Sequence, residues 1–167
     1  MLLLASLSAA QEVAVQTLVQ ERRIPYSPNV VWAYLSDLTH FGRHDPFHHD
    51  FRFTSTRTSG LGAAFELRHT YLPIFPLPSD KVSCEVTSWL PGSRVTILER
   101  TPVRLKWHTQ SFVIVSSNDG QTVLRFVITY RGVPWILLPW RLWATWLVKK
   151  RMAEKLREIE RECALLA

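Results

Sequence analysis

The alternating segment Ala63–Leu72 carries the pair of residues best suited to acid–base chemistry. Phe65, Leu67, His69 and Tyr71 fall on one side of it, because successive side chains of a strand point to opposite faces. Histidine titrates near neutral pH and can donate or accept a proton. His69 and Tyr71 are therefore the best candidates for catalytic residues, while the reaction itself stays unassigned.

Three more polar side chains lie on otherwise apolar strand faces: Thr109, Ser111 and Tyr130. A few polar groups in an apolar wall are typical of a small-molecule site. The alternative is that each is a core polar group bonded to the backbone, as most buried polar groups are. For Thr109 and Ser111 we favour this alternative, because a hydroxyl is easily satisfied locally.

The segment His44–Asp50 is rich in side chains that can bind zinc or a similar ion. Its spacing does not place them on one face of a helix, and His48 and His49 would point apart in a strand. We therefore predict no metal site and interpret the segment as a polar loop. No cofactor is predicted, since Gly60-Leu61-Gly62 is too short for a phosphate-binding loop and lacks its lysine.

A long amphipathic helix ends the chain. From Trp140 onward there is no proline or glycine, and apolar residues recur at three- and four-residue steps. This apolar stripe consists of Trp140, Trp143, Leu147, Val148, Met152, Leu156, Ile159 and Cys163. Such a helix needs a broad apolar surface to lie on.

The first half of this helix has more aromatic and basic side chains than one stripe can bury. Leu142 and Trp146 lie off the stripe, and Lys149–Arg151 add three positive charges. Aromatic rings combined with cations are typical of contact with an anionic membrane surface. The structural alternative, that tryptophans cover the sheet, applies to Trp140 and Trp143. Trp146 and Lys149–Arg151 are thus the predicted site of transient membrane contact.

The composition fits a single domain with a substantial core. The chain has 167 residues, of which 47% are hydrophobic, and a formal net charge of +6. This charge is consistent with an anionic partner or simply with solubility. The basic residues are spread over several segments without a nucleic-acid-binding motif, so we predict no nucleic-acid partner. Cys84 and Cys163 lack metal-ligand spacing and are expected to be reduced, buried thiols.

The first ten residues are apolar like a signal peptide, but they lack a positive n-region and their apolar run is short. We expect an N-terminal arm or short helix over residues 1–12 and a single domain over 13–167. No segment reaches about 18 uninterrupted apolar residues. We therefore expect a cytoplasmic protein, with any membrane association peripheral.

Strand and turn patterns fill the chain between a first strand and the final helix. The expected order is strand, two short helices, about six strands and the long helix, which indicates an α+β domain with an antiparallel sheet. In the last hairpin, pairing Ser117 with Thr122 would place Val113 opposite Phe126, so that the apolar faces coincide. The same alternation assigns the polar side chains to the outer face: Arg104, Lys106, His108 and Gln110.

Several loose motifs occur along this order of elements. They are Ser27-Pro28-Asn29-Val30-Val31-Trp32 followed by Leu35-Ser36-Asp37, then Gly60-Leu61-Gly62, Pro91-Gly92 and Asp119-Gly120-Gln121-Thr122. Together they resemble the START-like (SRPBCC) superfamily, with its polyketide cyclase/dehydrase and lipid-transfer proteins, over roughly Val13–Leu166. The resemblance implies a helix-grip fold: a curved antiparallel sheet of about seven strands around the C-terminal helix, with a hydrophobic cavity between them. It implies no shared catalytic motif.

Given such a cavity, the alternation of the strands and the helix stripe predict which side chains face a ligand. They are Phe53, Phe65, Leu67, His69, Tyr71, Cys84, Trp107, Thr109, Ser111, Phe126, Tyr130, Trp140 and Trp143. The first hypothesis is binding, transport or sequestration of a hydrophobic small molecule, such as a lipid, isoprenoid, quinone or polyketide-like compound. The second is a metal-free cyclase or dehydratase with an acid–base residue in the cavity. The third is a protein-interaction domain.

Overall fold

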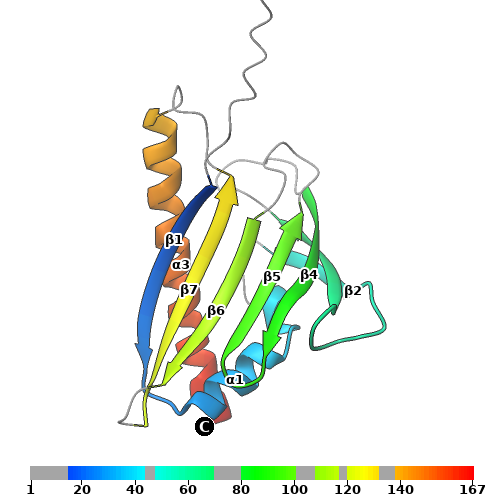
Figure 1. Cartoon of the computed structure of the whole chain (residues 1–167), viewed down its shortest axis with the longest axis vertical. Helices are drawn as coiled ribbons and strands as arrows, with labels where there is room; N and C mark the ends of the chain where they lie inside the picture. The colour runs from blue at the N-terminus through cyan, green and yellow to red at the C-terminus, as the bar shows by residue number, and fades with distance from the viewer. Residues whose placement is uncertain (1–14, 44–47, 70–79, 101–107, 117–119, 132–137) are drawn as a thin grey trace, which may run out of the picture.

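A seven-stranded antiparallel sheet curves around one long helix (Figure 1). The structure, a computed structural model, describes residues 15–43, 48–69, 80–100, 108–116, 120–131 and 138–167. The strands are β1 (Val15–Ile24), β2 (His48–Phe53), β3 (Ala64–His69), β4 (Asp80–Leu90), β5 (Arg94–Arg100), β6 (His108–Ser116) and β7 (Thr122–Arg131). Their order in the sheet is β1-β7-β6-β5-β4-β3-β2. The predicted α+β helix-grip fold is confirmed.

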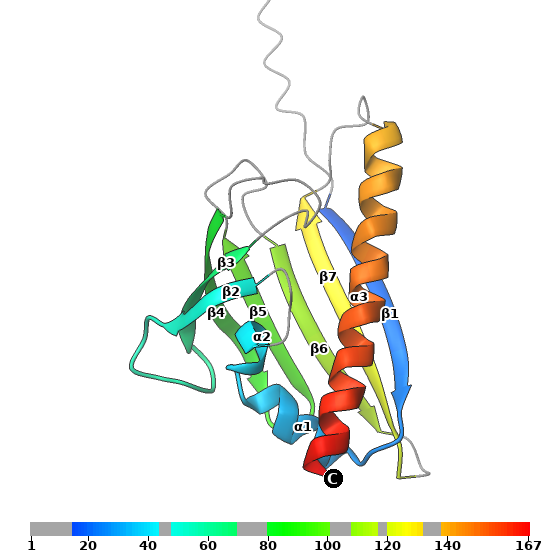
Figure 2. The ribbon, with the colours of Figure 1, turned by 180° about the vertical axis from the view of Figure 1, so that it is seen from behind.

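The described helices lie on the concave side of this sheet (Figure 2). They are α1 (Pro28–Ser36), α2 (His40–Arg43) and α3 (Leu138–Leu166). Ser27 occupies the N-cap position of α1 and Pro28 its first turn, as the sequence predicts. The long helix α3 runs beside β1 and β7 and also packs against α1. Helices α1 and α3 therefore together cover the apolar concave face of the sheet.

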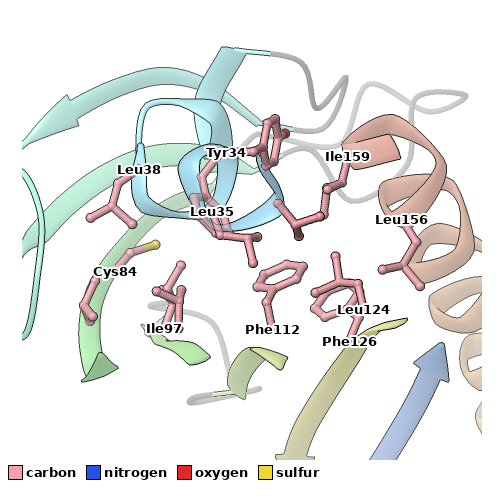
Figure 3. Packing of buried hydrophobic residues seen from close by; sticks show 14 of the residues in the cluster. Tyr34, Leu35, Leu38, Cys84, Ile97, Phe112, Leu124, Phe126, Leu156 and Ile159 are labelled. Carbon is pink, nitrogen blue, oxygen red and sulfur yellow. The ribbon is translucent and has the colours of Figure 1, made fainter. Parts of the chain in front are cut away.

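The concave face supplies most of the core (Figure 3). Val82, Cys84 and Val86 of β4 and Val95 and Ile97 of β5 are buried on it, as predicted. From the helices it receives Val31, Leu35, Met152, Leu156, Ile159 and Cys163. The predicted burial of both cysteines is confirmed, and both are free thiols.

Strand β6 presents the face opposite to the one predicted. Phe112 pairs with Phe126, and Ser116 with Thr122, one residue away from the predicted register. Phe112 is fully buried and stacks on Phe126 with ring centroids 4.3 Å apart (Figure 3). The prediction was wrong because it turned Val113 inward. Turning Phe112 inward buries more apolar area, even though it brings polar side chains onto the same face.

In this register, four polar side chains lie on the face of the sheet opposite to the one predicted. Thr109 and Ser111 lie on the convex face, where the Ser111 hydroxyl is 3.0 Å from the Thr96 hydroxyl. His108 and Gln110 lie on the concave face, because they pair with the inward positions of β5. The outer charged face predicted for this hairpin therefore does not include His108 or Gln110.

Among the described side chains of α3, those that are fully buried lie in its C-terminal half. Met152 and the stripe residues after it are inaccessible, whereas Leu142 is 65% and Trp146 58% exposed, as their positions off the stripe predict. Trp143 was expected in the core but is 46% exposed. The reason is that the first turns of α3 extend past the end of β1, so none of the described strands lies beneath them (Figures 1 and 2). Within the described part of the chain, no helix is both long and apolar enough to cross a bilayer.

The register of β6 can be tested with two neighbouring substitutions. Phe112→Ala should lower the free energy of unfolding by about 3–5 kcal/mol, because it leaves a cavity in the core. Val113→Ala, on the convex face, should cost less than about 1 kcal/mol. Urea denaturation of both variants measures the difference, and a larger loss from Val113→Ala would contradict this register.

Candidate functional site

The concave face is fully covered at one end and only partly covered at the other. Phe112 of β6 and Leu124 of β7, near α1 and the second half of α3, are inaccessible to solvent. Further along the same strands, toward the first half of α3, Gln110, Ile128 and Tyr130 are only half-buried. We call this second region the open end of the concave face. A mixture of partly covered apolar and polar side chains is what a ligand-binding surface offers.

A buried carboxylate lies in the wall of the open end. Glu99, which follows Val95 and Ile97 on the inward side of β5, is only 3% exposed. It pairs directly with His108 on β6, and His108 Nε2 is 2.8 Å from Glu99 Oε2. Gln110 donates its side-chain N–H to Glu99 Oε1. Both oxygens of the carboxylate are thus engaged by neighbouring side chains of β6.

The ion pair favours the charged form of both partners. Burial by itself would raise the pKa of Glu99, but the charge of His108 and its bond to the carboxylate outweigh burial, and this pKa falls to about 2. Burial by itself would lower the pKa of His108, but the charge of Glu99 overcomes it, and the pKa of His108 rises above its ordinary value. His48 and His69 also lower the pKa of Glu99 through their charges. The site is therefore a carboxylate surrounded by imidazoles.

His69 ends β3 on the same concave face, as predicted. Its ring meets that of His48 on β2 edge to face, with centroids 4.9 Å apart. The His48 Nδ1 atom is 3.1 Å from the carbonyl oxygen of Phe41, which ties this end of the sheet to α2. His48 is half-buried and the adjacent His49 exposed, so the two point apart as expected. Within the described residues, no set of three metal-binding side chains is close enough to hold an ion.

The other wall of the open end is formed by β7 and β1. Tyr130 pairs with Gln16, and the Tyr130 hydroxyl donates to Gln16 Oε1 at 2.9 Å. Ile128, one inward position closer to the core, is partly buried and packs against the core. Tyr130 is consequently both a satisfied polar group and a residue of the ligand-facing wall.

The structure places the predicted ligand-facing residues in different surroundings. Those buried in the core are Phe65, Leu67, Cys84 and Phe126, with Phe53 packed at its margin. His69 and Tyr130 are half-buried on the concave face, whereas Thr109 and Ser111 are on the convex face and Trp143 is exposed. Tyr71 and Trp107, and the side chain of Trp140, lie outside the described residues.

The sequence interpretation missed the Glu99, His108 and Gln110 cluster. Glu99 follows the inward residues Val95 and Ile97 at two-residue steps, so the alternation itself contained this signal. His108 and Gln110 were assigned to the outer face because polar side chains usually point to solvent. A buried carboxylate reverses that expectation, since it requires hydrogen-bond donors beside it.

A second recess lies among the helices and is less suited to a ligand. It is lined by Tyr34, His40, Phe112 and Lys155, among others, and leaves no space for even a water molecule. The rings of Tyr34 and His40 in its lining stack on each other with centroids 4.3 Å apart. Ligand pockets usually measure roughly 300–1,000 Å3, so this recess is more simply a packing gap between α1 and α3.

Comparison with known proteins identifies the family. The model of the family described as "Polyketide cyclase / dehydrase and lipid transport" matches residues 15–164, which include the whole sheet and nearly all of α3. The chain belongs to this family. No curated protein matches it in sequence.

Solved structures show the same fold at low sequence identity. The Zhui aromatase/cyclase from Streptomyces sp. R1128 has a TM-score of 0.71 at 10% identity, over 90% of this chain and 94% of that one. A norcoclaurine synthase mutant from Thalictrum flavum has a TM-score of 0.67 at 9% identity, over 90% and 95%. The corresponding values for Ara h 8.0201 are 0.64 and 12%, over 90% and 99%. Family and fold together support a hydrophobic ligand-binding scaffold.

The ion pair predicts that the free energy of unfolding falls at both low and high pH, once for each partner. The contribution of Glu99 is complete above its ordinary pKa of 4.5 and is lost as the pH falls toward about 2. The contribution of His108 is complete below its ordinary pKa of 6.5 and is lost as the pH rises through its raised value. Urea denaturation at a series of pH values should therefore show the full effect of the pair between 4.5 and 6.5.

Glu99→Gln should remove both pH-dependent contributions to the free energy of unfolding. Within that window it should lower the free energy of unfolding by about 3–5 kcal/mol, because it leaves the buried imidazolium unpaired. The matched control is Glu85→Gln on the convex face, whose exposed carboxylate is 3.7 Å from Arg100. It should cost less than about 1 kcal/mol. Equal losses from both variants would contradict a structural role for the buried pair.

Proposed function

We propose that this protein binds a hydrophobic small molecule, such as a lipid, isoprenoid, quinone or polyketide-like compound, at the open end of its concave face. The observation that carries the proposal is the change in burial along β6 and β7, from inaccessible Phe112 and Leu124 to half-buried Gln110 and Ile128. A ligand between these strands and the first half of α3 would complete the cover of the sheet. Its apolar part would gain about 25 cal/mol for each Å2 removed from water.

The polar cluster at this end favours a ligand with one oxygen-bearing group. His108 is 22% exposed at its side chain, and both His108 and Gln110 have nitrogen-bound hydrogens beside the ligand-facing surface. A wholly hydrocarbon ligand would remove water from these groups without replacing its hydrogen bonds. A carbonyl, hydroxyl or carboxylate at one end of the ligand would accept them. The cluster would thus set the orientation of the bound molecule.

A pair of adjacent substitutions on β7 tests this location. Native mass spectrometry of protein purified from its own host, followed by solvent extraction, should find a bound apolar molecule. Ile128→Trp should fill the open end and abolish this binding. Val127→Trp adds the same ring on the convex face and should leave binding unchanged, because Val127 pairs with the outward-facing Ser111.

Two results would contradict the proposed location of the ligand. Protein that carries no apolar molecule and binds no apolar fluorescent probe would exclude a ligand site here. Loss of binding in Val127→Trp but not in Ile128→Trp would place the site on the other face. Thermal unfolding of both variants controls for a general loss of structure.

A second candidate function, acid–base catalysis on the bound molecule, is favoured by the His108–Glu99 pair. A carboxylate that holds one imidazole nitrogen leaves the other available for proton transfer. Protonated His108 could give its proton to a departing hydroxyl group, which would leave as water. This arrangement makes His108, rather than His69, the better candidate for the acid–base residue of a dehydratase or cyclase.

Once a substrate is known, two histidine variants separate these roles. His108→Gln should reduce turnover by about 100-fold or more while the molecule still binds, as expected for loss of a general acid. His69→Gln should change turnover by much less. Unchanged turnover in His108→Gln would remove it as the catalyst and leave a binding protein.

A further inference from the structure

The first half of α3 exposes a group of side chains that combines apolar, aromatic and basic residues. We call Leu142, Trp143, Trp146, Lys149 and Lys150 the docking patch. Leu142 and Trp146 are more than half exposed, and both lysines are exposed as well. Leu142, Trp146, Lys149 and Lys150 follow at steps of four, three and one, which places them on one side of the helix. Trp143 flanks this side.

The charge of α3 changes sharply along its length. Residues 138–153 contain four basic side chains and no acidic one. Residues 154–166 contain four glutamates and three basic side chains, so their charges nearly balance. In that second half, Glu160 pairs with Arg22 of β1, and Lys155 lies 3.0 Å from Glu158. The positive charge is thus concentrated in the half of the helix whose described side chains are less buried.

An aromatic and a cationic group of the docking patch lie next to each other. The Lys150 Nζ atom is 5.7 Å from the centroid of the Trp146 ring, within the range of a cation–π contact. Indole rings and lysine ammonium groups favour the headgroup region of a bilayer, where a ring is partly buried and a charge stays hydrated. Exposed Leu142 adds an apolar side chain for which a nucleic-acid backbone offers no counterpart.

We propose that the docking patch binds the surface of an anionic lipid bilayer, with α3 lying against the membrane rather than crossing it. Leu142, Trp143 and Trp146 would enter the headgroup boundary, and Lys149 and Lys150 would contact anionic lipid. The first turns of α3 lie at the same end of the molecule as the open end of the concave face (Figure 2). Docking would therefore bring that end of the sheet close to the lipid. This interaction goes beyond the proposed ligand site and does not depend on it.

Vesicle flotation tests the proposal with the full chain. We expect binding to phosphatidylcholine vesicles that contain about one-third phosphatidylserine, and much weaker binding to phosphatidylcholine alone. The double variants Lys149→Glu/Lys150→Glu and Leu142→Ser/Trp146→Ser should each reduce the bound fraction by about tenfold. Circular dichroism should show folded protein in both, because the substituted side chains are exposed.

The C-terminal turns of the same helix provide matched controls. Leu165 and Leu166 are exposed leucines, and Arg157 and Arg161 are exposed basic residues at the opposite end of α3. Leu165→Ser/Leu166→Ser and Arg157→Glu/Arg161→Glu should float like the wild type.

Three results would overturn the proposal. The first is no binding of the wild type to anionic vesicles, and the second is equal loss in the control variants. The third is a dimer in size-exclusion chromatography that dissociates in Leu142→Ser/Trp146→Ser, which would make the patch a contact between two copies of the chain. The vesicles contain none of the protein's own ligand. The result of the flotation experiment therefore does not depend on the result of the ligand experiments.

Discussion

The structure depends on one constraint: a curved sheet with an apolar concave face must cover that face, and the described helices cover only part of it. At one end, α1 and the second half of α3 enclose Phe112, Leu124 and Ile97 completely. At the other end, the first turns of α3 extend past the end of β1, and the concave side chains are only half-buried. The covered end holds the fold together, and the open end is where we propose that a ligand binds.

The buried carboxylate makes sense within that division. An ionised Glu99 in a core would be strongly unfavourable without a positive partner and hydrogen bonds. His108 and Gln110 supply both, yet an apolar trio of similar volume would stabilise a fold at least as well. A polar cluster that stability does not require, placed where the cover of the sheet is incomplete, is best explained by a ligand that it orients. The same argument makes His108 a candidate for proton transfer.

The sequence predicted the fold well because its hydrophobic pattern is strong wherever packing alone decides. The inward residues of β4 and β5, the Ser27-Pro28 start of α1 and the stripe from Met152 to Cys163 all follow simple periodicity. Prediction failed where polar residues face inward or apolar ones face outward. Both classes of error, His108 and Gln110 in β6 and Trp143 in α3, fall at the open end of the sheet or beside it. For these three residues the pattern pointed to the wrong side, because the interpretation assumed that burial follows polarity.

Binding of an apolar molecule at the open end of the concave face can be tested directly by an amide NMR titration. Labelled protein would be titrated with a long-chain fatty acid as the probe. We predict shifts at His108, Gln110, Ile128 and Tyr130, with little change at Leu124 or at the convex-face residues Thr96 and Ser111. Shifts confined to the convex face, or none at saturating probe, would contradict it.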